Sequence, residues 1–430
     1  MTEPTRILYF APDASGGGAH VLRDIVSRLD RSDFEPMVVF ATGPDDPRAA
    51  RSKSFFEGHQ VPVEFMGQPG TRVYGGGAVM KQKRRDIGKW LRRNLGKRVG
   101  NGYDTVRALY RFIRRDWKNA RHLGLLLEKH NIGLLHVNGT GGSEAAIVAS
   151  RLAKVPCVAH VHMFPKVTGF HRYIGRFVSR FLYISNAVRL WCEESGWGQG
   201  ELLHNGVDTQ RFTKTRLGGS RSNGWGCSER DKLVGMLGRI VPWKGQHVFV
   251  QAMEIIAKVR PDARAVIVGE VGSGQIDQHY YDQLKTSIDR LDLGSHVSFV
   301  KELEDVPALL NDLDVLVHGS VEPEPFGLVI IEGMATATPV VATLGGGVND
   351  IIQPGENGLL VPPNDSKELA RSVLRILDDQ ALAAKLSQKG RQTVVTQFTL
   401  EQQVDRVTKV YRHLLSDVVN DSNPTLSVAK

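Results

Sequence analysis

The sequence has little cysteine and no long apolar run. Its 430 residues include only three cysteines, far apart and without C-x-x-C spacing: Cys157, Cys192 and Cys227. This pattern excludes a disulfide framework and a zinc ribbon, and it predicts free thiols in a reducing compartment. No segment reaches the roughly 18 uncharged apolar residues that span a bilayer. The first residues do not resemble a signal peptide. We therefore expect a cytoplasmic protein.

Length and composition predict a folded chain with more than one core. Hydrophobic residues make up 41% of the sequence and charged residues 23%, which is the range of globular proteins rather than disordered ones. A chain of this length exceeds one ordinary hydrophobic core. We therefore expect at least two domains.

The positive charge is concentrated in one segment. Between Lys81 and Arg121 there are 15 lysines and arginines against three aspartates, a balance of +12, although the whole chain carries only +9. Apolar residues at helical spacing predict two short amphipathic helices here, separated by Gly100 and Gly102. The apolar positions are Ile87, Trp90, Leu91 and Leu95 in the first helix, and Val106, Leu109, Tyr110, Ile113 and Trp117 in the second.

This basic segment has three possible interpretations. Cationic helices with tryptophan on the apolar face suit an anionic membrane surface, and the protein would then be peripheral on its cytoplasmic face. The alternative is a solvated basic face on helices that pack against the domain. Nucleic acid is disfavoured, because no helix-turn-helix, RNP or OB-type pattern accompanies the charge.

Short apolar runs alternate with helix-length segments along the chain, which predicts parallel sheets covered by helices. The predicted strands of the first half are Arg6–Ala11, Glu35–Ala41, Val61–Met66, Gly133–Val137, Cys157–His162 and Phe181–Ile184. Those of the second half are Leu233–Leu237, Arg264–Val268, Val297–Val300, Val315–His318, Val340–Ala342 and Gly358–Val361. Between the halves lies the polar, glycine-rich segment Thr213–Arg230. Its composition predicts a linker and an early loop of the second domain. The pattern favours two doubly wound domains with a cleft between them.

Two carboxylates frame the turn at Phe326 and Gly327. Glu324 and Glu332 are eight positions apart, so that one lies on a loop and the other lies a turn or two into the following helix. The loop follows the strand ending at His318, and open α/β sheets bind ligands at that end of their strands. Backbone N–H groups near the start of the helix would suit an anion. The segment therefore predicts phosphate and polyol hydroxyls as ligands.

A second loop supplies positive charge. Arg239 and Lys244 follow the strand Leu233–Leu237, ahead of a helix that we expect to begin near Gly245. Arginine can bind two phosphate oxygens, and lysine adds a point charge. Cations aimed at a diphosphate leaving group would stabilise the charge that develops on it.

Gly16, Gly17 and Gly18 follow the first predicted strand, ahead of a helix that we expect near Ala19. They permit a tight turn and close approach to an acceptor or a phosphate, although a turn that only reverses the chain is the alternative. The G-x-G-x-x-G fingerprint of nicotinamide dinucleotide sites is absent.

Taken together, these motifs resemble the retaining GT-B glycosyltransferases of family 4, whose signature is E-x7-E. The resemblance extends over nearly the whole chain. It includes the glycine-rich first loop and the segments Pro156–His162, Ser185-Asn186 and Asn205–Asp208, together with a closing helix that carries Tyr411. It implies two Rossmann-like domains. The acceptor domain would be 1–205 with the basic insertion 81–121, the nucleotide-sugar domain 206–400, and 401–430 a helix that could return to the first domain.

The resemblance also implies roles for individual residues. Arg239 and Lys244 would bind the donor diphosphate, Glu324 the donor sugar, and Glu332 the ribose hydroxyls. The amides of Phe326, Gly327, Leu328 and Val329 would face phosphate. His162 matches the histidine beside the sugar, whereas His160 lies two residues short of that position. No side-chain nucleophile is implied, because the leaving phosphate helps to deprotonate the acceptor.

The resemblance therefore implies a retaining glycosyltransferase that uses a UDP- or GDP-linked sugar and no other cofactor. Its acceptor would be a glycan or a lipid-linked intermediate of cell-surface polysaccharide or glycolipid synthesis. A metal is not expected, because Asp312-Leu313-Asp314 precedes its strand and is interpreted as a surface pair at a helix end. The alternatives are a non-catalytic protein that binds a membrane or a partner, and a nucleotide-sugar epimerase of the same architecture.

Overall fold

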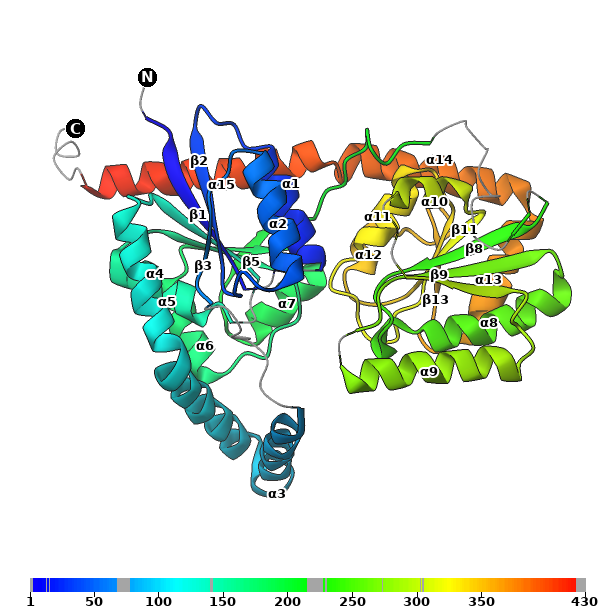
Figure 1. Ribbon diagram of the computed structural model, residues 1–430, viewed down its shortest axis with the longest axis horizontal. Helices are drawn as coiled ribbons and strands as arrows, with labels where there is room; N and C mark the ends of the chain where they lie inside the picture. The colour runs from blue at the N-terminus through cyan, green and yellow to red at the C-terminus, as the bar shows by residue number, and fades with distance from the viewer. Residues whose placement is uncertain are drawn as a thin grey trace. The chain divides into compact units, whose positions relative to one another are not determined.

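The structure is a computed structural model that divides the chain into two compact units (Figure 1). The first unit comprises Met1–His204 and Gln403–Lys430, and the second unit comprises Asn205–Gln402. The residues described are 3–12, 14, 16–67, 78–139, 142–214, 227–228, 230–272, 274–301, 303 and 305–422, without the side chains of 47–48, 78–92, 94–95 and 418–422. Most of the predicted linker, 215–226, lies outside them.

The described strands of the first unit form one seven-stranded parallel sheet in the order β3-β2-β1-β4-β5-β6-β7. Its strands are β1 (Thr5–Ala11), β2 (Phe34–Phe40), β3 (Val63–Phe65), β4 (Leu134–Asn138), β5 (Cys157–Val161), β6 (Arg180–Tyr183) and β7 (Gly200–Leu202). All residues of β4 and β5 are buried, as expected of central strands covered on both faces. The strand order reverses between β1 and β4. Open α/β sheets bind ligands beside the carboxyl ends of the strands at such a reversal.

Helices cover both faces of this sheet. Figure 1 shows α1 and α2 on one side and α4 and α5 on the other. The helices are α1 (Gly17–Ser27), α2 (Pro47–Gly58), α3 (Ala78–Arg111), the π-helix η1 (Phe112–Asp116), α4 (Trp117–Lys129), α5 (Glu144–Ala153), α6 (Gly169–Ile174), η2 (Gly175–Phe177) and α7 (Asn186–Glu194). The last helix, α15 (Leu400–Ser422), begins in the second unit and continues into the first.

The second unit holds a six-stranded parallel sheet in the order β10-β9-β8-β11-β12-β13. Its strands are β8 (Lys232–Leu237), β9 (Ala263–Val268), β10 (Val297–Val300), β11 (Val315–His318), β12 (Val340–Thr343) and β13 (Leu359–Val361). Its helices are η3 (Pro242–Lys244), α8 (Gln246–Val259), α9 (Gln275–Arg290), α10 (Val306–Asp312), α11 (Leu328–Ala335), α12 (Val348–Ile351), α13 (Ser366–Asp378) and α14 (Gln380–Gln397). Here the strand order reverses between β8 and β11.

The predicted fold class is confirmed. Each predicted strand corresponds to an observed one, with ends that differ by no more than two residues. The sequence analysis missed β7, a three-residue edge strand without a fully buried residue. An apolar run cannot reveal such a strand, because one of its sides has no neighbour to bury it.

The basic segment differs from its prediction. We expected two short helices separated at Gly100 and Gly102, but α3 runs through both glycines. The chain instead breaks at Gly96, whose φ of 87° and ψ of 163° lie outside the helical region. Only glycine adopts that conformation without strain, whereas the other two glycines keep helical geometry. The helical segment then continues through η1 into α4.

Asp116 is a buried acid at the end of η1, with only 7% of its surface exposed. Burial and the nearby carboxylate of Glu144 raise its pKa to about 6. An acid whose pKa is higher in the folded state stabilises the fold at low pH, and that contribution is lost as the pH rises through the folded pKa. We therefore expect Asp116→Asn to raise the free energy of unfolding at pH 8 by roughly 2 kcal/mol.

This gain should shrink as the pH falls through 6 and be small near pH 4, where Asp116 is protonated in the folded state and about half protonated in the unfolded state. Urea unfolding of both proteins from pH 4 to 8 measures it. Asp104 provides a matched control. It is equally buried but forms an ion pair with Lys166, with 2.8 Å between Lys166 Nζ and Asp104 Oδ2. Asp104→Asn should be destabilising at pH 8. A loss of stability in Asp116→Asn at that pH would contradict the assignment.

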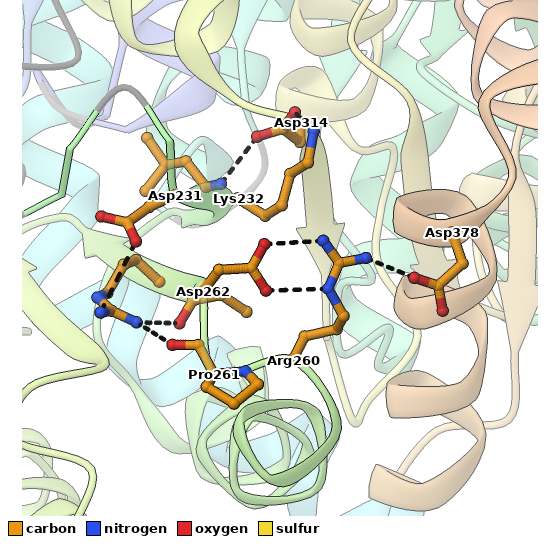
Figure 2. Close-up of polar contacts among 10 residues, drawn as sticks. Asp231, Lys232, Arg260, Pro261, Asp262, Asp314 and Asp378 are labelled. Carbon is orange, nitrogen blue, oxygen red and sulfur yellow. Dashed lines mark hydrogen bonds and ion pairs between the residues drawn. The ribbon is translucent and has the colours of Figure 1, made fainter.

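Acidic residues precede three strands at the amino-terminal edge of the second sheet. Asp231, Asp262 and Asp314 stand directly before β8, β9 and β11, and Figure 2 shows them among lysine and arginine partners. Asp314 accepts a hydrogen bond from the backbone N–H of Leu233 at 2.9 Å and pairs with Lys232 at 3.3 Å. It therefore stabilises the start of β8.

The interpretation of Asp312 and Asp314 as a surface pair is accordingly wrong. Asp312 does end α10, but it is buried, and the side chain of Asp314 is only 18% exposed. Among the described residues, no group of three or more histidines, cysteines and acids is placed to hold a metal.

Arg260 connects two elements in the same cluster. Its Nε and Nη2 donate to both carboxylate oxygens of Asp262 at 2.9 and 2.8 Å, and its Nη1 donates to Asp378 at the end of α13 at 2.5 Å (Figure 2). Bidentate ion pairs in a network contribute more to folding stability than isolated surface ion pairs do. We expect Arg260→Ala to lower the free energy of unfolding of the second unit by roughly 1–2 kcal/mol.

Lys258→Ala serves as the control for Arg260→Ala in urea titrations. Lys258 also forms an ion pair, with Glu254 at 2.7 Å, but its side chain is 71% exposed. Its removal should change the stability by no more than about 0.5 kcal/mol. If both substitutions changed the free energy of unfolding equally, the network would contribute no more stability than a single surface ion pair.

Candidate functional site

The carboxyl ends of β8 and β11 bring a lysine and a glutamate together in the second unit. Lys244 lies in η3, after β8, and Glu324 lies on the loop after β11. Lys244 Nζ is 2.6 Å from Glu324 Oε2, and both side chains are largely buried. This position is the reversal point of the strand order, where open α/β sheets bind ligands. The structure thus places two of the predicted site residues in direct contact.

Close backbone approach positions the lysine. Gly245 has a φ of 76°, and a Cβ atom there would lie 2.0 Å from the carbonyl oxygen of Gly319. The loop before Glu324 can therefore pass directly against the turn that carries Lys244. The ammonium group also lies 4.3 Å from the centroid of the Trp243 ring, a cation–π distance. These contacts hold the charge at the sheet edge.

Three donors converge on one oxygen of Glu324. Its Oε2 accepts hydrogen bonds from Lys244 Nζ at 2.6 Å, Ser320 Oγ at 2.8 Å and His318 Nε2 at 2.9 Å. Burial alone would raise the pKa of Glu324, but the His318 hydrogen bond and the Lys244 charge outweigh burial and hold the pKa far below its usual range. Glu324 is therefore an ionised acceptor at neutral pH.

The other oxygen of this carboxylate is open. No described residue donates a hydrogen bond to Oε1, whereas Oε2 is fully engaged. Because an ionised carboxylate can accept on both oxygens, Oε1 is available to a ligand hydroxyl. An ammonium group likewise has three N–H donors, of which Glu324 takes one. The pair can therefore present an acceptor and a cation to one ligand.

Glycines support the loop that carries Glu324. A Cβ atom on Gly346, whose φ is 70°, would lie 2.0 Å from the carbonyl oxygen of Glu324, so only glycine fits there. The next amide, of Gly347, donates to that carbonyl at 2.7 Å. Thr343 Oγ1 similarly donates to the carbonyl of Ser320 at 2.7 Å. The carboxylate is thus held by its backbone as well as by its side chain.

The helix α11 begins beside this loop. Gly327 precedes it with a φ of 110°, and Phe326 is buried against Phe398. The amides of Leu328 and Val329 stand in the first turn, where helices leave N–H groups without intrahelical acceptors. Such amides, together with the helix dipole, favour an anion.

The remaining predicted residues of this unit take different positions. Arg239 is exposed on the loop after β8, and its carbonyl oxygen accepts from Gln246 Nε2 at 2.9 Å. Its neighbour Gly238 lies close to Lys244, since a Cβ atom there would be 4.0 Å from Lys244 Cε. Glu332 is half-buried in the second turn of α11. The diphosphate and ribose roles of Arg239 and Glu332 stay predictions.

The first unit brings its own predicted residues together at the ends of β1 and β5. The loop of Gly16, Gly17 and Gly18 leads into α1, and Gly16 has a φ of 81°. The ring of His162 lies over this loop, 3.5 Å from where a Cβ atom of Gly18 would be. His162 Nε2 also lies 2.9 Å from Asn138 Oδ1, at the end of β4.

His160, which lies two residues short of the family histidine, is a core residue. It is fully buried, its ring centroid lies 4.1 Å from that of His162, and burial lowers its pKa well below the ordinary value. On its other side lies His136, with ring centroids 5.4 Å apart. Its neutral ring therefore supports His162 from within the sheet.

Sequence reasoning missed His318, Ser320 and Asn138. His318 was assigned only to the strand β11, although a histidine that ends a buried strand at the ligand edge is a recognisable signal. Asn138 holds the same place on β4. The signal for Ser320 is weaker, because only the fold shows that its hydroxyl reaches Glu324.

Comparisons with known proteins identify the family of this chain. A model of glycosyl transferases group 1 matches residues 222–393, and a model of glycosyltransferase family 4 matches residues 15–211. The two matches together include every predicted site residue and every described strand except β1. The chain belongs to the group 1 glycosyltransferases. The family that its motifs resemble is thereby confirmed.

Sequence relatives of this group 1 glycosyltransferase are distant. A lipopolysaccharide core biosynthesis mannosyltransferase of Rhizobium meliloti is 30% identical over 216 residues, which are 50% of this chain and 60% of the relative. The chain thus matches little more than half of that relative's length. An Escherichia coli UDP-Gal:α-D-GlcNAc-diphosphoundecaprenol α-1,3-galactosyltransferase is 25% identical over 315 residues, 69% of this chain and 79% of the relative.

The same fold occurs in a solved structure, the UDP-glucose complex of HepE from Anabaena. It is 23% identical, covers 95% of this chain and 99% of its own, and superposes with a TM-score of 0.74. At that identity the likeness establishes the fold, which is of the GT-B type.

Proposed function

We propose that this protein is a retaining glycosyltransferase that moves a sugar from a nucleotide diphosphate sugar to a glycan or lipid-linked acceptor. The observation that carries the proposal is the buried Lys244–Glu324 pair at the strand-order reversal of the second sheet. It sets a fixed cation and an open carboxylate oxygen side by side. A sugar linked to a diphosphate requires both.

In this proposal the donor diphosphate lies against Lys244, Arg239 and the first turn of α11. These groups neutralise the negative charge that grows on the leaving phosphate as its bond to the sugar breaks. They supply positive charge from the protein itself, so that the reaction needs no metal ion. Glu324 Oε1 accepts hydroxyls of the sugar, and Glu332 accepts those of the nucleotide ribose.

The acceptor hydroxyl attacks on the face of the sugar that the phosphate leaves, which retains the configuration of the anomeric carbon. The departing phosphate oxygen takes the acceptor proton, so that no side-chain nucleophile is required. The relatives support the class of acceptor, because their names specify lipopolysaccharide core and a diphosphoundecaprenol-linked sugar. They differ in the sugar transferred, and we propose a UDP- or GDP-linked donor.

Donor binding can be tested by thermal shift with UDP, GDP, ADP and their sugars. A ligand that binds only the folded state at 100 times its Kd adds about 2.7 kcal/mol of stability, which should raise Tm by about 5–10 °C. Nucleotides and nucleotide sugars of one of the three bases should raise Tm more than those of the other two. A Tm that none of them shifts would contradict the proposed donor class.

The stereochemistry provides an independent test. Proton NMR of the product distinguishes the two anomers, and the proposal requires the anomer of the donor. An inverted linkage would exclude the retaining mechanism. Isomerisation of the donor without any acceptor would instead support the epimerase alternative, and a folded protein that binds no nucleotide sugar would support the non-catalytic one.

We further propose that the first unit docks on an anionic membrane through α3, η1 and α4. The apolar positions predicted for the second helix of this segment keep much of their surface exposed: Val106, Leu109, Tyr110, Ile113 and Trp117 are 68, 43, 59, 59 and 41% exposed. The opposite side of the same helices is buried, at Asp104, Ala108, Phe112 and Asp116. The apolar stripe is therefore outward-facing. The side chains of 78–92, including Ile87, Trp90 and Leu91, and of Leu95 lie outside the described residues.

Charge complementarity selects the partner. Arg98, Arg114 and Lys118 are exposed in the same segment, and basic side chains around an apolar stripe suit anionic lipid headgroups. A solvated face does not account for five exposed large apolar side chains that recur at helical spacing in one segment. In the part of the chain that the structure describes, no helix is long and apolar enough to cross a bilayer.

Co-sedimentation with vesicles tests this surface. We expect binding to vesicles that contain phosphatidylglycerol, weaker binding to pure phosphatidylcholine, and weakening by salt. Tyr110→Gln with Ile113→Gln should lower the partition constant by about tenfold. Ile276→Gln is the matched control, because Ile276 is 72% exposed but lies on α9 of the second unit. Equal binding of all variants to both vesicles would support the solvated face instead.

A further inference from the structure

The amide of Asn138 is held in one orientation. Its Nδ2 donates to the carbonyl oxygen of Gly18 at 2.9 Å, and its Oδ1 lies 2.9 Å from His162 Nε2. A carbonyl oxygen can only accept, so the NH2 side of the amide must face Gly18. The oxygen of the amide must therefore face His162. The side chain is 5% exposed, which limits its freedom to rotate.

The orientation of Asn138 determines where His162 carries its proton. Because Asn138 Oδ1 can only accept, His162 Nε2 has to donate and therefore carries the hydrogen. In a neutral imidazole the other nitrogen, Nδ1, is then an acceptor with a free lone pair. No described residue donates a hydrogen bond to Nδ1. His162 is only half-buried, and Nδ1 is not among the fully buried side-chain nitrogens that lack a partner, so this nitrogen is accessible to a ligand.

We propose that Asn138 is a positioning residue that holds His162 as the Nε2–H tautomer and thereby makes Nδ1 an acceptor for a substrate hydroxyl. This inference rests on the proposed function for the identity of the ligand as a sugar. It predicts that the ligand group bound at the carboxyl ends of β1, β4 and β5 is neutral and carries a hydroxyl, and is not a phosphate. Asn138 acts through His162 and touches no substrate itself.

The neighbours of His162 keep the ring neutral. Burial lowers the pKa of His162 to about 4, and burial also lowers the pKa of His136 to about 3. Among the residues that the structure describes, the ring contacts the neutral His160, the Gly18 backbone and the Asn138 amide. A neutral ring whose exposed nitrogen is an acceptor repels the lone pairs of an anion and binds an O–H donor. The predicted phosphate role of Gly16–Gly18 is therefore less suitable here than the acceptor-binding role.

The tautomer can be read directly by long-range proton–nitrogen NMR of the 15N-labelled full-length protein at pH 7. Loss of one set of imidazole signals in His162→Gln assigns the resonances of His162. We expect a protonated, pyrrole-type Nε2 and a bare, pyridine-type Nδ1. In Asn138→Ala the two nitrogen shifts should move toward each other as the tautomers mix. The signals of His171, which lies in the first unit and takes part in the capping box of α6, report whether the variant stays folded.

Activity gives a second, separable measurement. Asn138→Ala should lower kcat/KM for transfer by about tenfold, the effect expected when one hydrogen bond to a hydroxyl weakens. Asn138→Asp should hold the proton on Nε2 but favour the imidazolium, so that its activity falls as the pH is lowered, at a higher pH than in the wild type.

Wild-type His162 with its proton on Nδ1, or charged at pH 7, would overturn the inference. So would an unchanged His162 spectrum in a folded Asn138→Ala variant. Absence of any sugar transfer in a protein with the expected spectrum would overturn the proposed function and leave the tautomer assignment standing.

Discussion

Lys244→Ala should lower kcat for sugar transfer by about a hundred- to a thousandfold, the loss typical when a group that stabilises developing negative charge is removed. Lys244 is the largely buried cation of the site, held 2.6 Å from Glu324. Its loss removes charge from the leaving diphosphate. It also leaves Glu324 with only His318 and Ser320 as donors, so that the pKa of Glu324 should rise toward its ordinary range.

The same change affects stability, because it leaves a buried carboxylate without its ion-pair partner. Glu324→Gln is therefore the companion variant. It keeps the shape of the side chain and removes the charge, and it too should reduce turnover at least a hundredfold while the protein stays folded. Lys258→Ala, on the exposed side of α8, is the matched lysine control and should retain full activity. Turnover within a few-fold of wild type in both site variants would contradict the roles assigned to this pair.

Tyr411→Ala should lower the free energy of unfolding of the first unit by roughly 3–5 kcal/mol. Tyr411 lies on α15 and is fully buried among residues of β1, β2 and β4. Its ring packs edge-on against Phe34, with centroids 5.8 Å apart, and against Tyr9, at 6.5 Å. Truncation would leave a cavity that neighbouring rings cannot fill by small movements.

A second substitution separates the ring from its hydroxyl. Tyr411 Oη lies at hydrogen-bond distance from His136 Nδ1, 2.7 Å, and accepts from Tyr9 Oη at 3.2 Å. Tyr411→Phe keeps the packing but leaves both groups without this partner in a buried place, at a cost of about 1–3 kcal/mol. Guanidinium titrations followed by fluorescence would measure both variants. A loss below about 1 kcal/mol for Tyr411→Ala would show that α15 contributes little to the first unit.

The sequence predicted the two sheets because their central strands are buried on both faces and therefore appear as uninterrupted apolar runs. β4 and β5 are the clearest examples. The helical break at Gly96 was not predictable, since Gly100 and Gly102 carry the same local signal and only the observed dihedral angles separate the three.

The site was predictable in its charged residues and not in their neighbours. Lys244 and Glu324 belong to motifs on loops at strand ends, and topology places such loops together. The contacts of Glu324 with His318 and Ser320 depend on how one loop folds over a strand end, which no spacing encodes. The same holds for the amide of Asn138, whose partners are 120 and 24 residues away in the chain.

The return of the chain through α15 has a consequence for protein synthesis. The second unit is one continuous stretch, but the first is completed only by residues after Gln402. A ribosome releases the amino-terminal part first, so β1, β2 and β4 leave the exit tunnel long before the aromatic side chain that closes their core. Until α15 has been synthesised and has left the exit tunnel, the nascent first unit exposes the apolar surface that Tyr411 later covers. We therefore expect a nascent chain stalled shortly before Gln403 to bind chaperones more strongly than the finished protein does.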